Sequence, residues 1–137
     1  MAQEFFEWKP EYSLNIIEID NQHKKIIELL NQLYEAFMKK DHHEKLGSII
    51  DELEKYAVYH FGTEENYFNK FGYTGKVEHV NEHARFKEKV RSFKDDFNKN
   101  KGALTFTVIN FLKDWLNKHI LIDDKKYQNL FSEMGLT

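Results

Sequence analysis

The most regular feature of this sequence is a set of apolar residues that recur every three or four positions, which is the spacing of one face of an α-helix. The pattern appears four times and predicts helices over about residues 20–39, 43–70, 75–98 and 104–120. A single Pro and six Gly leave these long segments almost free of helix breakers. The pattern and the composition together favour helix over strand, and we expect an all-α protein.

Residues typical of helix ends mark the limits of these segments. Asp20 is the predicted N-cap of the first helix and Thr74 that of the third, because their side-chain oxygens can accept hydrogen bonds from the first turn. Gly72 would end the second helix, and a polar run that closes at Gly102 would end the third. These boundaries leave short connections between successive helices.

Short connections favour one arrangement, an antiparallel up-down-up-down four-helix bundle over about residues 20–120. An irregular N-terminal arm of about residues 1–19 would precede the bundle, and a C-terminal segment of about residues 121–137 would follow it, with a short helix near 125–131. The chain has 137 residues, of which 41% are hydrophobic and 31% charged, as is usual for one compact soluble domain. We therefore expect residues 1–137 to form a single domain.

Composition and charge exclude several classes of function. The chain has no cysteine, which rules out disulfides, thiolate metal sites, iron–sulfur clusters and a thiol nucleophile. The formal net charge is −3, and no basic stripe interleaved with aromatic residues predicts a nucleic-acid surface. The first residues do not resemble a signal peptide, and no stretch approaches the roughly 20 apolar residues of a membrane span. We expect a cytoplasmic protein that binds neither nucleic acid nor membrane.

Polar residues break the apolar helix faces, and every break is a histidine or a carboxylate. They occur on all four predicted helices, at His23, His60, Glu64, His79, His83 and His119. On its own, each histidine would be read as a hydrogen-bonded core residue. Five imidazoles and a carboxylate in one core are different, because unsatisfied buried polar groups cost about 1–3 kcal/mol each. A metal centre would satisfy the whole set.

The set offers too many donors for one tetrahedral zinc ion, and it suits two metal ions bridged by carboxylates. Glu64 is one candidate bridge and Asp124 is the second. His119 and Asp124 would lie about 140° apart on a regular helix, so they converge only if the fourth helix ends or bulges between Ile120 and Asp123. On spacing alone, Asp123 competes with Asp124 for this role.

Taken together, these residues resemble those of the hemerythrin family, in particular its single-domain bacterial members. The resemblance rests on Trp8 in the arm and on motifs spread over nearly the whole chain: Ile19-Asp-Asn-Gln-His-Lys24, His60-Phe-Gly-Thr-Glu-Glu65, Gly72-Tyr73, His79-Val-Asn-Glu-His83, Trp115-Leu116 and His119-Ile-Leu-Ile-Asp-Asp124. Their combined spacing is specific, although each motif alone is weak. Two positions depart from the family pattern: Asn15, where many relatives carry Gly, and Thr74, where Pro is frequent. Asn tolerates a left-handed backbone and Thr can cap a helix.

The resemblance implies a non-haem centre of two iron ions that binds dioxygen reversibly. By that resemblance, one iron would be held by His79, His83 and His119, the other by His23 and His60, with Glu64 and Asp124 bridging both. The resemblance also favours Asp124 over Asp123. It places Phe61, Trp115, Leu116 and Ile120 in an apolar pocket around the dioxygen; by themselves these residues are equally well explained as core packing.

The balance of ligands supports an oxygen carrier over an oxidase. Ferritin-like oxidases carry Glu-x-x-His motifs and further Glu ligands, whereas this chain has no such motif and only two bridge candidates. Fewer anionic ligands stabilise high-valent iron less, so the centre is expected to release oxygen and not to act as an enzyme. The ligand types alone do not identify the metal, since they also suit zinc, manganese, nickel and copper.

Two alternatives remain open at this point. The same centre could serve sensing or detoxification of oxygen, peroxide or nitric oxide. The segment His79-Val-Asn-Glu82-His83 also fits the pattern of inverted zinc peptidases, with Glu82 as general base, although a hydrolase would leave His23 and His60 unexplained. The remaining histidines, His42 and His43, are expected to lie in a solvated turn.

Overall fold

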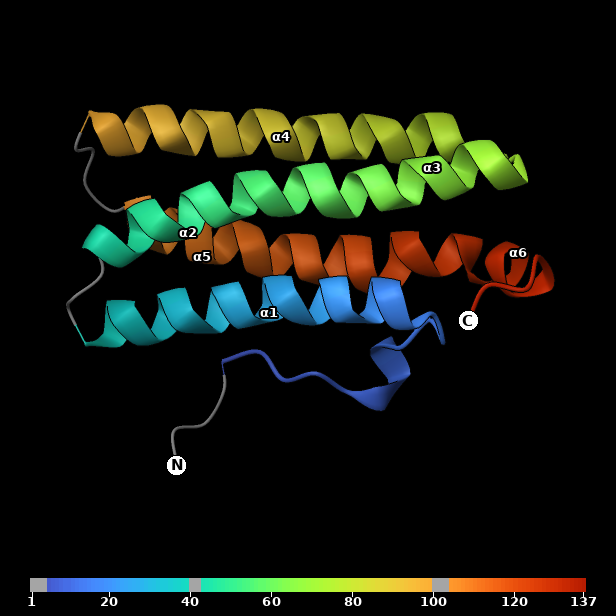
Figure 1. Ribbon diagram of the computed structural model, residues 1–137. Coiled ribbons are helices and arrows are strands. Elements are labelled where there is room, and N and C mark those ends of the chain that lie inside the picture. The colour runs from blue at the N-terminus through green and yellow to red at the C-terminus, as the bar shows by residue number, and fades with distance from the viewer. Residues whose placement is uncertain (1–4, 40–42, 100–103) are drawn as a thin grey trace.

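In the computed structural model of the chain, the described residues are 5–39, 43–99 and 104–137. Their helices form four long rods. The rods lie side by side and alternate in direction (Figure 1). The first rod is α1 (Ile17–Met38), and the third is α4 (Lys76–Asn98). Each rod packs against two neighbours, so that the four enclose a common core. The predicted all-α, antiparallel four-helix bundle is confirmed.

The second rod contains a π-helical segment. It consists of α2 (His43–Tyr56), the π-helical segment η2 (Ala57–Phe61) and α3 (Gly62–Phe71), which follow one another without a break. Gly72 ends this rod in the left-handed conformation, with φ of 67°, and its N–H donates to the carbonyl of Phe68. Glycine has no Cβ atom and adopts this conformation without steric strain, which explains why the rod ends where the sequence predicts.

The fourth rod departs further from a regular α-helix. It begins as α5 (Leu104–Trp115), widens into the π-helical segment η3 (Leu116–Asp123) and tightens into the 3₁₀ turn η4 (Asp124–Tyr127). A short helix, α6 (Gln128–Glu133), ends it. The predicted end near Ile120 is therefore too early, and the predicted tail helix is a 3₁₀ turn followed by α6. Such π segments are rare and often occur at functional sites.

The boundary between the N-terminal arm and the first helix also differs from the prediction. A 3₁₀ turn, η1 (Pro10–Tyr12), lies in the arm, and α1 starts at Ile17, so the arm ends before residue 19. Asp20 is not an N-cap: it lies within the first turn of α1, where its carboxylate accepts hydrogen bonds from the Ser13 hydroxyl and, at 2.8 Å, from the Leu14 N–H. These two hydrogen bonds hold the arm against the first turn of α1.

Two further local predictions have different outcomes. Thr74 does not cap α4, whose N-cap residue is Gly75 and has no side-chain hydrogen bond. Asn15 does adopt the left-handed conformation, with φ of 59°. His42 lies outside the described residues, whereas His43 is exposed at the start of α2 and stacks on Phe97.

The apolar interior is divided into two clusters. The main core runs along the bundle and includes Leu33, Leu53, Phe86, Val108 and Leu116. The end cluster lies where the arm, α3 and α6 meet and consists of Leu14, Ile16, Ile19, Phe68, Tyr127 and Phe131. Tyr127 and Phe131 are fully buried here, so they pack on their own bundle. None of the described helices is long and apolar enough to cross a membrane.

Candidate metal centre

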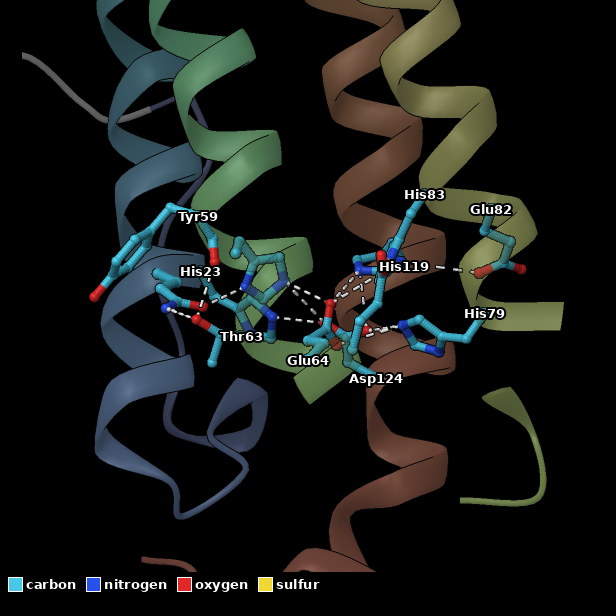
Figure 2. A network of polar contacts seen from close by, with 12 residues as sticks. His23, Tyr59, Thr63, Glu64, His79, Glu82, His83, His119 and Asp124 are labelled. Carbon is cyan, nitrogen blue, oxygen red and sulfur yellow. Dashed lines mark hydrogen bonds and ion pairs between the residues drawn. The ribbon is translucent and has the colours of Figure 1, made fainter. Parts of the chain in front are cut away.

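Seven buried polar side chains meet in the interior of the bundle, and all of them are predicted site residues. Each is at most 4% exposed: His23, His60, Glu64, His79, His83, His119 and Asp124. They come from every rod, since α1 carries His23, the second rod His60 and Glu64, α4 the pair His79 and His83, and the fourth rod His119 and Asp124. In Figure 2 the two carboxylates lie at the centre of this group, with histidines on both sides.

The carboxylate of Glu64 contacts four imidazoles, each through its Nε2 atom. Its Oε1 atom lies 3.0 Å from His60, 3.1 Å from His83 and 3.4 Å from His119, and its Oε2 atom lies 3.3 Å from His79. His60 and Glu64 are four residues apart, across the junction of η2 and α3, and this spacing places them on one face.

The carboxylate of Asp124 also contacts four imidazoles through their Nε2 atoms. Its Oδ1 atom lies 2.8 Å from Nε2 of His79 and 3.0 Å from Nε2 of His119. Its Oδ2 atom lies 2.7 Å from Nε2 of His23 and 3.5 Å from Nε2 of His60. All five histidines therefore turn Nε2 toward these two carboxylates.

The π-helical segment η3 explains how His119 and Asp124 meet. The sequence spacing requires the fourth helix to end or bulge after Ile120, and η3 with the following turn η4 meets this condition. Asp123, the competing candidate, is also buried but lies near Glu82 and His119, and forms an ion pair of 3.5 Å with Lys126.

Many of these atoms are close together without forming hydrogen bonds. Nε2 of His60, His79 and His119, together with Glu64 Oε2 and Asp124 Oδ1, are buried and have no hydrogen-bond partner, although each lies within 3.5 Å of an opposite partner. Leaving such groups unsatisfied is costly. A metal ion requires donor atoms that converge on one point without bonding one another. These residues therefore fit a metal ion.

Two groups of possible metal ligands share the residues Glu64 and His119. Glu64, His79, His83 and His119 offer four atoms within 4.8 Å of one another, and so do His60, Glu64, His119 and Asp124. His23 belongs to neither set and joins the cluster through Asp124. The overlap at Glu64 and His119 is compatible with two adjacent metal ions and uses only nitrogen and oxygen donors.

The electrostatics of the metal-free cluster keep both carboxylates ionised. Burial opposes ionisation of Glu64, but the neighbouring histidines, led by His60, hold its pKa well below the usual range. Burial and the charge of Glu64 likewise oppose ionisation of Asp124, but His119 and His23 hold its pKa well below the usual range. Two anions in an apolar interior attract cations, which protons supply when no metal is bound.

The histidines respond to these anions in different ways. Burial lowers the pKa of His79, but Asp124 and Glu64 outweigh it and raise the pKa to about 9. The pKa of His119 is raised well above its usual value for the same reason. Burial dominates at His23 and lowers its pKa, which leaves a neutral imidazole, the form that binds metals.

Two of the four predicted apolar residues, Phe61 and Trp115, lie against histidines of the cluster. Phe61, Leu116 and Ile120 are at most 1% exposed, and Trp115 is partly buried. Phe61 stacks on the ring of His83, and Trp115 stacks on the ring of His119. These two side chains therefore cover histidines predicted for the three-histidine iron.

Several polar residues that the sequence analysis did not assign to the metal centre lie on the Nδ1 side of the histidines. Gln22 bonds His60 at 2.5 Å, Glu65 bonds His83 at 2.9 Å, and Glu82 lies 3.9 Å from His119. Such partners orient metal-bound histidines and fix the ring proton. The signal available in the sequence was their position within or beside the histidine motifs.

Comparisons with known proteins agree with this geometry. Residues 15–131 match the Hemerythrin HHE cation binding domain. The chain is 37% identical over 126 residues to the bacteriohemerythrin of Clostridium acetobutylicum, covering 89% of this chain and 98% of the relative. It is 35% identical over 106 residues to that of Aquifex aeolicus, covering 74% and 79%.

Solved structures show the same likeness in three dimensions. A wild-type hemerythrin superposes with a TM-score of 0.83 at 28% identity, covering 93% of this chain and 98% of the other. Two hemerythrin variants with one leucine replaced superpose with a TM-score of 0.85 at 27% identity, covering 95% of this chain and 99% of the other. With the family match, the shared fold and a buried cluster of histidines and carboxylates, this chain belongs to the hemerythrin family.

Proposed function

We propose that this protein binds dioxygen reversibly at a centre of two non-haem iron ions and does so without acting as an enzyme. The observation that carries the proposal is the convergence of five Nε2 atoms on the carboxylates of Glu64 and Asp124, with several of these atoms buried and unbonded. When bound, the two iron ions supply the reversible binding of dioxygen.

The residues divide into two groups in this proposal. His79, His83 and His119 would hold one iron, and His23 with His60 would hold the other. Glu64 and Asp124 would serve both irons, because each carboxylate contacts histidines of both groups. The smaller number of histidines on the second iron leaves room there for an external ligand.

The apolar residues have a protective role in the proposal. Phe61, Trp115, Leu116 and Ile120 would exclude water from the centre when it is loaded. Carrier, storage or delivery functions all use this property, and dioxygen is the only partner that the proposal requires.

Glu82 bears on the hydrolase alternative. Its carboxylate lies on the Nδ1 side of His119, with Asp123, whereas the metal-facing nitrogens are Nε2. A general base for water activation must reach the metal-facing side of the ligands. The position of Glu82 therefore favours oxygen binding over zinc-dependent hydrolysis.

The test is spectroscopic. The purified protein would be loaded with iron, reduced without oxygen, and cycled between oxygen and argon while the visible spectrum is recorded. We expect two iron ions per chain and a charge-transfer band that appears with oxygen and vanishes under argon. Two bound irons without a reversible band would favour redox or sensing chemistry, and failure to bind iron would contradict the proposal.

A further inference from the structure

A chain of hydrogen bonds leads from His60 to the protein surface, away from the carboxylates. Nδ1 of His60 lies 2.5 Å from Oε1 of Gln22, and Nε2 of Gln22 lies 3.1 Å from Oγ1 of Thr63. Oγ1 of Thr63 lies 2.9 Å from the backbone carbonyl oxygen of Tyr59 (Figure 2). The chain connects a fully buried imidazole with the backbone of a residue that is 65% exposed.

The direction of these hydrogen bonds is fixed at the Tyr59 end. A backbone carbonyl can only accept, so the Thr63 hydroxyl must donate its single proton there. The Thr63 oxygen then accepts from the amide nitrogen of Gln22, which turns the amide oxygen of Gln22 toward His60. An amide oxygen also only accepts, so Nδ1 of His60 must carry the ring proton.

This protonation state has a direct consequence for the opposite nitrogen. In the neutral ring, a proton on Nδ1 leaves the lone pair on Nε2, the atom that lies 3.0 Å from Glu64 and 3.5 Å from Asp124 and that a metal ion would bind. We propose that Gln22 and Thr63 are positioning residues that hold the proton of His60 on Nδ1 and so prepare Nε2 to bind a metal ion. The inference rests on the proposed function, since it assigns them a role at the same centre.

The other histidines show why Thr63 is needed. His83 faces the carboxylate of Glu65, and a carboxylate accepts through either oxygen, whichever way it turns. Gln22 instead has one accepting and one donating end. A reversed amide would place its NH₂ group against Nδ1 and favour the proton on Nε2, where it competes with the metal. Thr63 removes this ambiguity.

The surroundings of Gln22 make such an orienting partner necessary. Gln22 is one of the residues lining a surface groove of about 360 Å³ between α1 and the second rod, together with Tyr56 and Tyr59. Water in a groove can donate to or accept from an amide and does not favour either orientation. The threonine does, because its own proton is committed to the Tyr59 carbonyl.

The test uses the zinc-loaded protein, because zinc is diamagnetic and takes the same imidazole ligands. With ¹⁵N-labelled histidine, NMR reports the Nδ1–H proton of His60 and its exchange with water, and competition with a chelator reports zinc affinity. Thr63→Val keeps the shape but removes the hydroxyl, Thr63→Ser keeps the hydroxyl, and Gln22→Met, which removes the amide, identifies the His60 signal.

In the wild type we expect a slowly exchanging His60 Nδ1–H. Thr63→Val should accelerate its exchange and weaken zinc binding by about tenfold, the lower end of the effect of losing an outer partner of a metal ligand. Gln22→Met should do both more strongly, and Thr63→Ser should restore wild-type values. The exchange rate separates positioning from a general loss of stability, since a distant fold defect would not single out this proton.

Other results would overturn the inference. An unchanged proton signal and affinity in Thr63→Val would show that Thr63 does not orient Gln22. Equal losses in Thr63→Val and Thr63→Ser would show that packing and not the hydroxyl matters. If the wild type itself failed to take up two metal ions per chain, the proposed function would fail instead, and the two failures are therefore distinguishable.

Discussion

Phe61 lies face to face with the imidazole of His83, with ring centroids 3.8 Å apart and planes inclined by 7°. Trp115 covers His119 in the same way, at 4.2 Å and 14°. Each of these imidazoles also has a carboxylate, Glu65 or Glu82, on its Nδ1 side. An aromatic face and a polar partner together restrict rotation of the ring, so the ligand atoms are held in place before any metal arrives.

The stacking predicts that Phe61→Leu weakens both the fold and the site. Loss of a buried aromatic contact should lower the free energy of unfolding by about 1–3 kcal/mol. Metal affinity should also fall, because His83 gains freedom. Denaturant unfolding of the metal-free protein and chelator competition measure the two effects. The control is Phe131→Leu, equally buried but in the end cluster, which should destabilise the fold with little change in metal affinity.

Neighbouring aspartates provide a sharp test of the bridging role. Asp124→Asn should abolish binding of a second metal ion, because the substitution keeps the shape but removes a charge that contacts four histidines. Asp123→Asn should leave two metal ions per chain. Metal content after dialysis measures both, and equal metal content in the two variants would remove Asp124 from the bridging position.

Leu116→Ala should leave iron bound but accelerate autoxidation of the oxygenated protein. Leu116 is fully buried at the start of η3, one turn before His119, and its truncation would admit water to the centre. Decay of the visible band under oxygen measures the rate. Leu112→Ala, equally buried on α5, controls for the loss of core packing, which costs about 2–5 kcal/mol in either variant. Similar rates in both variants would argue against a special role for Leu116.

Metal uptake should release protons and become tighter as the pH rises. In the metal-free protein the pKa of His79 is about 9, above its ordinary value of 6.5, so the imidazole is protonated at pH 7. A metal ion binds only the neutral ring and must displace that proton. Affinity should therefore increase from pH 7 to about 9, and zinc addition should acidify a weakly buffered solution. A pH-independent affinity over this range would contradict the pKa shift.

The helices could be predicted from sequence because their apolar spacing reflects burial directly. Boundaries set by tertiary contacts could not. The start of α1 at Ile17 depends on the arm, whose Ser13 and Leu14 bond Asp20 from outside the helix. Burial of Tyr127 likewise depends on Phe68 and Phe131, which the end cluster brings together from distant parts of the chain.

The candidate site likewise contains residues that could be predicted from the sequence and residues that could not. Histidines on apolar faces are unusual enough to be recognised, and their spacing places them correctly in the interior. Gln22 and Glu65 are polar residues on helices, which are usually solvated, so only their position next to the histidine motifs points to them. From the sequence, His119 and Asp124 could be expected to meet only if the fourth helix ended or bulged between them. Nothing in the local sequence shows that the π-helical segment η3 forms there.

The position of the centre between the main core and the end cluster affects how the protein unfolds. A layer of charged and hydrogen-bonding groups lies between the two apolar clusters, so we expect the metal-free chain to couple them weakly. Metal ions bound to all four rods would join both regions into one cooperative unit. Loading should therefore change a broad, stepwise melting transition into a single sharp one, so that occupancy of the centre would determine whether this small bundle behaves as one folding unit or two.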